Sequence, residues 1–264
     1  MERMPLSEKS RILITGASGV LGAELCRILD KRNIPYTGAG RSESSRQNWV
    51  SIDLKTGKNL SEAVKDKDIV FHLASDTKNF SRESDVDGTE KLCTAALNAG
   101  VRHFIYISIV GIDKVPYKYY EIKLETEQKI INSGLQYSIL RAVQFHDFMD
   151  MLLEKFTKFP VVFLPGKLKF QPIETSSVAE ELLRIAENPP LNSVRNLGGK
   201  EILPLSEIMR IWLKAQGRKR LVIPVPALGK MMKSLASGGL TCTEKSENSI
   251  TWSEWVMRKY SQGK

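Results

Sequence analysis

The stretch LITGASGVLGAE, residues 13 to 24, places three glycines at intervals of three directly after a short apolar run. The residues before it, RILIT at 11–15, are typical of a buried strand, and residues 20–31 carry apolar side chains at helical spacing. The sequence therefore predicts a strand, a tight turn and a helix. Because the first amides of a helix have no partner within it, this arrangement favours a bound anion at the turn.

Each glycine of the turn has its own expected role. Gly16 permits the sharp change of direction, Gly19 lets backbone amides approach a pyrophosphate, and Gly22 lets the helix pack closely on the strand. The spacing Gly-x-x-Gly-x-x-Gly is one residue wider than the usual fingerprint. We expect the whole turn to hold a nucleotide, through Gly16, Ser18, Gly19, Val20, Leu21 and Gly22.

Apolar runs and helical patterns alternate through the first half of the chain. Strands are expected at 11–15, 34–38, 49–52, 68–73, 102–108 and 136–141, and helices at 20–31, 85–99 and 118–133. This alternation predicts an α/β fold, a Rossmann-type doubly wound parallel sheet. After residue 142 the rhythm changes. We expect a nucleotide-binding domain over 1–142 and a smaller α+β substrate-side domain over 143–264.

Composition restricts the class of protein. The chain has 264 residues, of which 42% are hydrophobic and 26% charged, as in an ordinary globular protein. It lacks a membrane-length apolar run and a secretory leader, so we expect it in the cytoplasm, away from membranes. Three scattered cysteines, Cys26, Cys93 and Cys242, have no metal-ligand spacing and predict free thiols without a metal. A net charge of +9 favours anionic ligands, and no nucleic-acid-binding motif accompanies it.

The end of the second strand indicates which nucleotide is bound. An NAD-type site carries an acidic residue there, whereas this chain has Gly38-Ala39-Gly40-Arg41-Ser42. Arg41 is suited to clamp a 2′-phosphate, and Ser42 to hydrogen-bond it. The sequence therefore predicts NADP(H) in preference to NAD(H). The alternative is that Arg41 is a solvated loop residue.

Two further loops are expected to border the cofactor. Asp53 and Leu54 follow the third strand and would lie beside the adenine. Leu73, Ala74 and Ser75 follow the fourth strand and would lie under the pyrophosphate and ribose. Both predictions rest on the rule that ligands of doubly wound sheets bind beyond the carboxyl ends of the strands.

The motifs TGASGVLG, FHLAS, DVDGT and a later Tyr-x-x-x-Lys together resemble the short-chain dehydrogenase/reductase superfamily. The chain is most similar to its atypical, NmrA-like branch, related to the extended members. The segments YISIVGID, YYEIKLETE, ILRAVQFHDF and FQPIETSSVAE resemble uncharacterised NAD(P)-binding oxidoreductases of that branch. The resemblance implies a Rossmann domain, a small C-terminal substrate domain, and cofactor roles for Gly16, Gly19, Gly22 and Arg41.

The same resemblance implies a catalytic pair. Tyr119 and Lys123 lie four residues apart on a predicted helix and therefore share one face. In the superfamily the tyrosine transfers the proton, while the lysine lowers its pKa and binds the nicotinamide ribose. A free phenol, with a pKa of about 10, needs such a cation to act at neutral pH. Tyr117 and Tyr120 are alternative phenols.

A serine after the preceding strand holds the substrate oxygen in the superfamily. Ser108 is the candidate in YISIVG, although another alignment puts Ile109 at that position. On the substrate side, Gln144 and His146 are candidates to contact a polar group, and Phe145 and Phe148 to wall the nicotinamide. The alternative is a plain strand–helix junction with His146 at the helix start.

Three functions are compatible with these features. The first is an NADPH-dependent reductase of a small carbonyl or activated double bond, or the reverse dehydrogenase, on a small-molecule substrate that the sequence does not name. The second is a non-catalytic NADP(H) redox sensor that reports to a protein partner. The third is a nucleotide-sugar epimerase or dehydratase.

Overall fold

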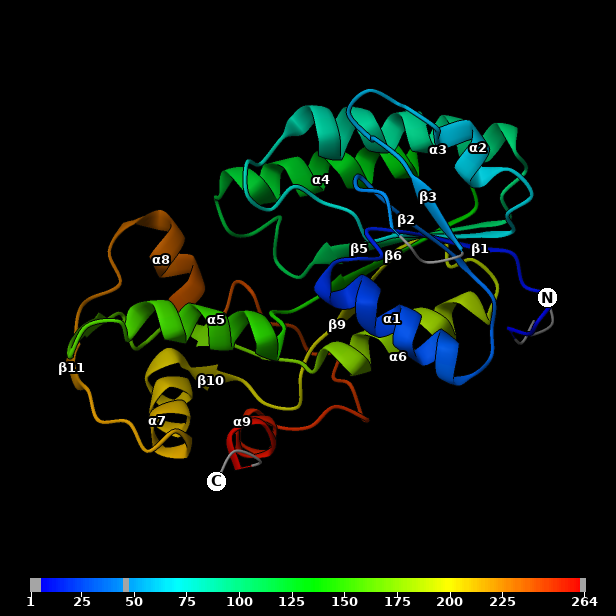
Figure 1. The fold of residues 1–264 in the computed structure, drawn as a ribbon. Helices are drawn as coiled ribbons and strands as arrows, with labels where there is room; N and C mark the ends of the chain where they lie inside the picture. Colours follow the sequence, from blue (N-terminus) through cyan, green and yellow to red (C-terminus); the bar gives the residue numbers. More distant parts are fainter. Residues whose placement is uncertain (1–5, 45–47, 262–264) are drawn as a thin grey trace. The chain divides into compact units, whose positions relative to one another are not determined.

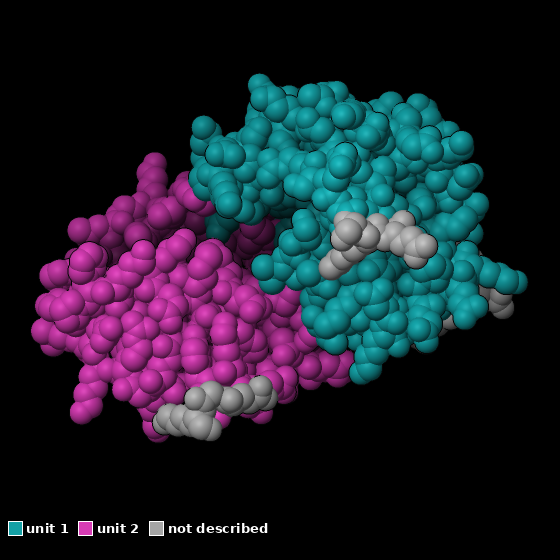
Figure 2. Space-filling view, in the orientation of Figure 1, with its two compact units in different colours: residues 1–108, 118–141, 178–195 teal, residues 109–117, 142–177, 196–264 magenta. Residues whose placement is uncertain are grey.

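A computed structural model describes residues 6–44 and 48–261 of the chain. The chain divides into two compact units, which are coloured separately in Figure 2. Unit 1 consists of residues 1–108, 118–141 and 178–195, and unit 2 of residues 109–117, 142–177 and 196–264. Unit 1 therefore takes one segment from the second half of the sequence. We describe each unit by itself.

A seven-stranded sheet has the strand order β3-β2-β1-β4-β5-β6-β9. Its strands are β1 (Ile12–Thr15), β2 (Thr37–Gly40), β3 (Trp49–Ser51), β4 (Ile69–His72), β5 (His103–Ile109), β6 (Tyr137–Ala142) and β9 (Val194–Leu197). The pairings from β3 through β5 are all parallel. The predicted Rossmann-type α/β fold is confirmed.

Helices cover the sheet of unit 1 (Figure 1). They are α1 (Val20–Lys31), α2 (Leu60–Val64), a short π-helical turn η1 (Glu83–Asp87), α3 (Gly88–Asn98), α4 (Lys118–Ile131) and α6 (Thr175–Ala186), whose first residues belong to unit 2. A buried cluster joins α2, α3 and α4 to the strands through Ala63, Leu92 and Ile130 on the helices and Leu13, Val70 and Phe104 on the strands. The longest described helix, α4, has 14 residues, and none in the described ranges is long and apolar enough to cross a membrane.

The second strand begins later than expected. The sequence predicts it near 34–38, whereas β2 spans Thr37–Gly40. After Thr37 this strand consists only of glycine and alanine, which do not favour strands by themselves. Gly38 pairs with Trp49 of β3, and the indole lies 2.9 and 2.8 Å from where side chains of Gly38 and Gly40 would begin. Glycine is needed here because the Trp49 ring covers the strand, a long-range contact that local periodicity does not reveal.

Strand order reverses beside β1, which lies between β2 and β4. Thr15 and His72, the last residues of β1 and β4, are direct partners in the register. The buried His72 ring joins Thr15 and Thr89 through hydrogen bonds of 2.7 and 2.8 Å. Burial, with the charge of Lys123, lowers the pKa of His72 to about 3, so its ring stays neutral and ties these elements together.

Unit 2, as far as the structure describes it, contains short strands and four helices besides the first turn of α6. Its strands are β7 (Val161–Leu164) with its parallel partner β11 (Leu221–Pro224), and β8 (Lys169–Phe170) with its antiparallel partner β10 (Leu203–Pro204). Its helices are α5 (His146–Phe156), α7 (Leu205–Ala215), α8 (Gly229–Ala236) and α9 (Trp252–Ser261).

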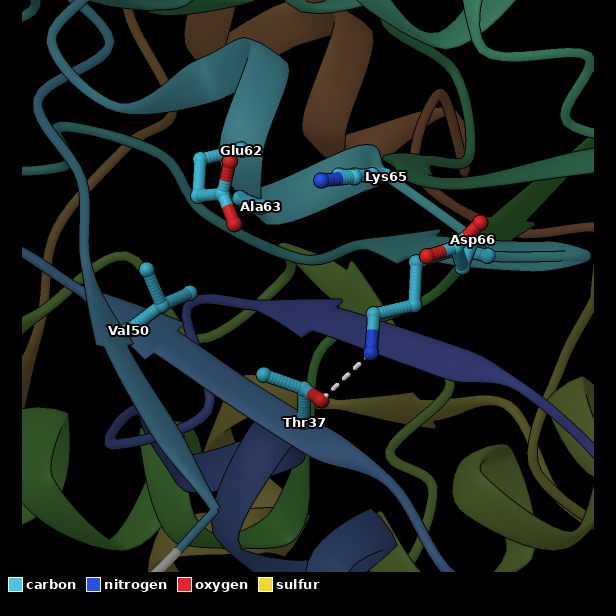
Figure 3. Close-up of a pocket in the computed structure, with 7 residues that line it drawn as sticks. Thr37, Val50, Glu62, Ala63, Lys65 and Asp66 are labelled. Carbon is cyan, nitrogen blue, oxygen red and sulfur yellow. Dashed lines mark hydrogen bonds between the residues drawn. The ribbon is translucent and has the colours of Figure 1, made fainter.

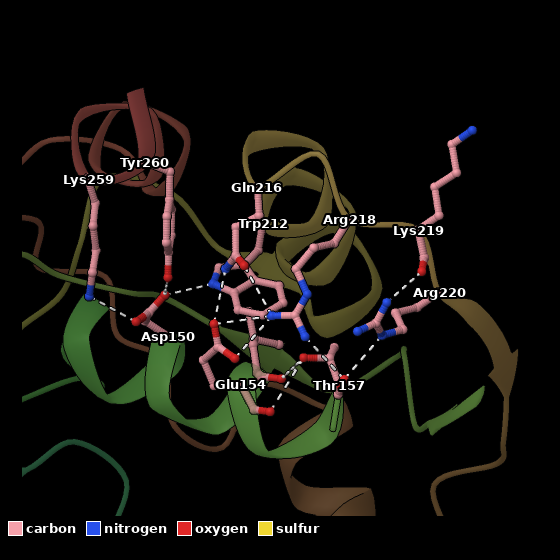
Figure 4. Close-up of polar contacts among 11 residues, drawn as sticks. Asp150, Glu154, Thr157, Trp212, Gln216, Arg218, Lys219, Arg220, Lys259 and Tyr260 are labelled. Carbon is pink, nitrogen blue, oxygen red and sulfur yellow. Dashed lines mark hydrogen bonds and ion pairs between the residues drawn. The ribbon is translucent and has the colours of Figure 1, made fainter. Parts of the chain in front are cut away.

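One buried carboxylate connects three of these helices (Figure 4). Asp150 of α5 accepts hydrogen bonds from the Trp212 indole of α7 at 2.7 Å and from Tyr260 Oη of α9 at 2.6 Å. It also accepts one from Lys259 Nζ at 2.9 Å. Since buried charge is stable only when well paired, this cluster fixes the register of α5 against α7 and α9.

Gly22→Ala is expected to destabilise the protein. Its new Cβ would lie 2.2 Å from the Gly16 carbonyl oxygen, so the backbone must shift, and such overpacking costs about 1–3 kcal/mol. The loss would appear although alanine favours helices over glycine. Urea unfolding measures it, with Gly19→Ala as control, since Gly19 has ordinary φ and only one neighbour, at 3.3 Å. Equal stability of both variants would contradict the close packing.

Candidate functional site

The glycine turn is held tightly against the end of β4. Gly16 has φ +72°, and a side chain there would begin 2.6 Å from the amide nitrogen of Ala74. The amides of Gly16 and Ala17 donate to the Ala39 carbonyl at 2.9 and 3.3 Å. The helix then packs on the turn at Gly22. The geometry therefore agrees with the roles expected for Gly16 and Gly22.

The start of α1 is left open toward solvent. Its N-cap, Gly19, offers no side-chain hydrogen bond, and the first turn has no acidic residue. Ala23 is the first amide to bond back, to Gly19 at 2.8 Å, so the amides of Val20, Leu21 and Gly22 have no helical partner. The side chains of Ser18 and Val20 are exposed, while that of Leu21 is buried. Bare amides at a positive helix end fit a pyrophosphate.

Arg41 follows β2 at the same edge of the sheet. Its side chain is exposed, and no described residue forms an ion pair with it. Two nearby carboxyl groups have lowered pKa values, mainly because Asn79 donates a hydrogen bond to Asp76 and Thr56 donates one to Asp53. The positive charge of Arg41 lowers both pKa values further. In Asp53 burial opposes that decrease. Arg41 thus stands near two carboxylates while keeping its guanidinium available for a phosphate. Ser42 accepts the Trp49 indole N–H on its carbonyl at 2.9 Å.

The loop after β3 is more self-contained than expected. Asp53 accepts the Lys55 amide at 2.9 Å and the Thr56 hydroxyl at 3.0 Å, which closes its own loop. Leu54 is buried against α3, where a side chain at Gly88 would begin 2.7 Å from its carbonyl oxygen. Their place beside an adenine stays a prediction.

Ser75 and Tyr119 meet at the end of β4. Their hydroxyl oxygens lie 2.9 Å apart, and Ser75 directly follows the Leu73–Ala74 segment against which Gly16 packs. The Tyr119 ring packs against Phe80 at 5.3 Å between centroids. The structure therefore brings the predicted phenol next to the loop predicted to lie under the cofactor. Of the alternative phenols, Tyr120 lies 6.2 Å from the Tyr119 ring and Tyr117 belongs to unit 2.

Lys123 is a buried cation one turn along α4 from Tyr119. Its Nζ donates to the Ile107 carbonyl at 2.8 Å and lies 4.1 Å from the centre of the Tyr106 ring. Burial lowers the pKa of Lys123 to about 8, and the charges of Asp85 and Glu127 oppose that shift. A buried amine with so perturbed a pKa is a mark of functional sites.

Ser108 is a buried residue of β5. Its side chain is 3% exposed, and its Oγ bonds to no residue of the described chain. Alternation along the strand puts Ser108 on the same face as Tyr106, and Ile109 on the other. Its role in holding a substrate oxygen stays a prediction.

The residues predicted on the substrate side lie in unit 2. The side-chain amide of Gln144 is buried, and within the described ranges neither its oxygen nor its nitrogen finds a partner. His146 begins α5 and packs against Trp252 and Trp255; burial lowers its pKa to about 4, opposed by the Pro172 carbonyl. Phe145 is the N-cap of α5, and Phe148 is 45% exposed.

A separate cavity of about 290 Å³ lies elsewhere in unit 1 (Figure 3). Its walls include Thr37, at the start of β2, and Lys67, whose Nζ donates to Thr37 Oγ1 at 2.7 Å. It therefore lies at the amino ends of the strands. Since nucleotides bind at the carboxyl ends, we assign it no part in the site.

Asp85 is the neighbour that the sequence did not single out. It is 3% exposed, accepts the Ser75 hydroxyl on Oδ2, and accepts the Asp76 amide on Oδ1 at 2.8 Å. It opens the motif DVDGT, which indicated a family but no chemistry for this residue. Only the folded chain brings η1 beside Ser75.

A family model described as NAD(P)H-binding matches residues 16–189. The chain belongs to this NAD(P)H-binding family. The match begins at the first glycine of the turn and covers β2 to β6 of the seven-stranded sheet, with Tyr119 and Lys123. The predicted nicotinamide-nucleotide cofactor and the recognition of the family are confirmed at this level.

Curated relatives match with lower coverage. A 3-beta-hydroxysteroid dehydrogenase of Mycolicibacterium neoaurum is 27% identical over 153 residues, which is 47% of this chain and 42% of that protein. A chloroplastic divinyl chlorophyllide a 8-vinyl-reductase of Cucumis sativus is 26% identical over 232 residues, 75% of this chain and 55% of that protein. The chain thus spans about half the length of these two relatives.

Solved structures share the fold over nearly the whole chain. An NADPH-dependent quinone oxidoreductase of Escherichia coli, complexed with NADPH, has a TM-score of 0.78 and 19% identity, covering 94% of this chain and 99% of that one. A nucleoside-diphosphate-sugar epimerase of Staphylococcus aureus has a TM-score of 0.80 and 19% identity at the same coverages. A Citrobacter triphenylmethane reductase complexed with NADP(H) has 0.79 and 16%, also covering 94% and 99%. At these identities the likeness establishes the fold.

Lys123→Met is expected to stabilise the protein most at neutral pH. The lysine pKa is lowered from 10.5 to about 8 in the native state, so between these values the unfolded chain binds more protons and native stability rises with pH. Below pH 8 the lysine is charged in both states, and its burial lowers the free energy of unfolding by about 3 kcal/mol for such a pKa shift.

Urea unfolding of the parent and Lys123→Met from pH 7 to 10 measures this effect. The advantage of the methionine variant should shrink as pH rises, because only the parent gains stability on losing the proton. A constant difference across the range would mean that Lys123 is not buried as a cation.

Proposed function

We propose that this chain is an NADP(H)-dependent oxidoreductase that reduces a small carbonyl compound or activated double bond, or runs the reverse dehydrogenation. The observation that carries the proposal is the 2.9 Å contact between Tyr119 and Ser75. It puts a phenol beside the loop against which the glycine turn packs, with buried Lys123 one helical turn away. A phenol and a cation at a nicotinamide site suit proton transfer coupled to hydride transfer.

The cofactor-binding residues divide by the group each would hold. Amides of Val20, Leu21 and Gly22 would bind the pyrophosphate, and Arg41 with Ser42 the 2′-phosphate. The bound cofactor supplies or accepts the hydride. The exposed guanidinium of Arg41, which no described residue pairs, and the absence of an acidic residue over 38–42 support NADP(H) over NAD(H).

Tyr119 would give or take the proton at the substrate oxygen. Lys123 would stabilise the phenolate, since a nearby positive charge favours ionisation of a phenol. Its depressed pKa, about 8, keeps most of the lysine charged at neutral pH. Gln144, with a buried amide that lacks a partner among the described residues, is our candidate to bind a polar group of the substrate. The named activities of the relatives, a dehydrogenase and a vinyl reductase, support this class of reaction.

A redox sensor that binds NADP(H) without turnover is the second candidate. The buried state of Ser108 favours it, because a serine 3% exposed offers little to a substrate oxygen. In that case a cofactor-dependent change in binding to a protein partner would replace catalysis.

Arg41→Ala is expected to weaken NADPH binding about tenfold or more, because a desolvated arginine–phosphate pair contributes about 2 kcal/mol. NADH affinity should change little. Calorimetric titration of both cofactors measures the preference, with Arg27→Ala, which removes an exposed charge paired to Glu24 on α1, as control. If Arg41→Ala keeps the parent's preference for NADPH, the 2′-phosphate is held elsewhere.

Tyr119→Phe separates the enzyme from the sensor. If Tyr119 carries the proton, the variant should bind NADPH as the parent does and turn over about 10²–10⁴ times more slowly. NADPH oxidation with a panel of quinones, aldehydes and enones provides the assay, and Tyr120→Phe is the matched control. A parent inactive on the whole panel would favour the sensor. Undiminished turnover in Tyr119→Phe would remove Tyr119 from the mechanism.

A further inference from the structure

A chain of hydrogen bonds leads inward from Tyr119. Tyr119 Oη lies 2.9 Å from Ser75 Oγ, and Ser75 Oγ donates to Asp85 Oδ2 at 2.5 Å. The second carboxylate oxygen of Asp85 accepts the Asp76 amide at 2.8 Å. All four residues belong to unit 1, and Asp85 is 3% exposed.

The number of protons on these groups decides which of them donates in each hydrogen bond. A serine hydroxyl has one proton, and that of Ser75 points to the carboxylate of Asp85. In the 2.9 Å contact Ser75 is therefore the acceptor and Tyr119 the donor. The phenol directs its proton toward Asp85 and presents its lone pairs to any other group.

We infer that Ser75 and Asp85 form a proton relay for Tyr119, with Asp85 as its terminus. The inference rests on the proposed function and assigns roles to two positioning residues. While Asp85 is a carboxylate, the relay draws protons out of the site and supports oxidation of an alcohol. When Asp85 is a carboxylic acid, the relay supplies the proton that reduction of a carbonyl requires.

In the oxidative direction the balance is complete. The alcohol O–H bond breaks as its proton passes to Tyr119 Oη, the proton of Tyr119 passes to Ser75 Oγ, and that of Ser75 passes to Asp85. The carbinol C–H bond breaks with its electron pair, which leaves as hydride to the oxidant, NADP⁺. The alcohol is thereby oxidised to a carbonyl and NADP⁺ reduced. Ser75 is partly exposed, so the proton on Asp85 can exchange with water.

The surroundings of Asp85 suit a relay terminus. Its backbone carbonyl accepts the hydroxyls of Thr89 and Thr126, at 2.5 and 3.3 Å, which fixes its position. The charge of Asp85 acts on Tyr106 of β5 and on Lys123 of α4 and raises the pKa of both. Asp76 gives Asp85 its amide, and further titratable groups on these elements include Tyr119 and Glu127 on α4 and His72 on β4. His72 stays neutral, so Lys123 is the cation that offsets the carboxylate.

Ionisation of Tyr119 tests the relay in the cofactor-free protein. Tyrosine labelled with ¹³C at Cζ reports each phenol by NMR, and Tyr119→Phe assigns the resonance. Asp85→Asn removes a nearby negative charge, and Ser75→Ala removes the acceptor of the phenolic proton. Both changes should lower the pKa of Tyr119, by about one unit. Asp87→Asn, which changes a partly exposed carboxylate of the same η1 turn that pairs with Arg82, should leave the Tyr119 pKa unchanged.

Turnover tests the transfer itself. Asp85→Asn should slow turnover about tenfold or more, because the relay would then end on an amide that cannot take up or release the proton. Ser75→Thr, which keeps a hydroxyl, should restore what Ser75→Ala loses.

Three outcomes would overturn the relay. One is an unchanged Tyr119 pKa in Asp85→Asn and Ser75→Ala. The second is a shifted Tyr119 pKa with unchanged turnover in Asp85→Asn, which would make Asp85 only an electrostatic neighbour. The third is no rescue by Ser75→Thr. If Asp85→Asn does not fold, Ser75→Ala carries the test alone. A parent without turnover would refute the proposed function, while the NMR titration would still judge the hydrogen-bonded chain.

Discussion

The close approach of Gly16 to the end of β4 is the constraint on which the site depends. No side chain fits between them, because it would begin 2.6 Å from the Ala74 amide. This contact leads the chain from β1 into α1 beside the Leu73–Ser75 loop. It therefore sets the open helix end, which suits a pyrophosphate, next to Ser75 and its hydrogen bond with Tyr119. One backbone contact thus places the glycine turn beside the hydroxyl groups of Ser75 and Tyr119.

Buried ionisable groups are concentrated behind that contact. His72, Asp85 and Lys123 are each at most 3% exposed, and they occupy a small region between β4, β5, η1 and α4. Burying charge opposes folding unless partners compensate, and apolar side chains would pack there at lower cost. In the part of the chain that the structure describes, Lys123 donates to one carbonyl, lies over a tyrosine ring and feels the charges of Asp85 and Glu127.

Unit 2 uses a buried carboxylate differently. Asp150 is saturated by a tryptophan, a tyrosine and a lysine from two helices, so its charge serves packing. Among the described residues, the carboxylate of Asp85 receives a serine hydroxyl and one amide, and the serine is in turn hydrogen-bonded to a phenol. The two carboxylates differ in whether their hydrogen-bond donors are themselves bonded to a further hydroxyl group. Donors that bond to Asp150 alone hold the helices in place. A series of hydroxyl groups that each hold an exchangeable proton can pass a proton along.

The sequence by itself determined the Rossmann fold, the α1 boundaries, the glycine turn before α1 and the position of Tyr119 and Lys123 one turn apart on a helix, because strand and helix periods and glycine spacing are local properties. The roles of these residues toward a cofactor stay predictions. Its placement of β2 near 34–38 was wrong, since Trp49, distant from Gly38 by eleven positions, decides that strand. The tertiary structure alone brought Asp85 to Ser75 and Ser75 to Tyr119, and it buried Lys123 and Ser108. These contacts join residues separated by 10 and 44 positions, and hydrogen bonds of that span are set by the packing of whole elements, not by local spacing.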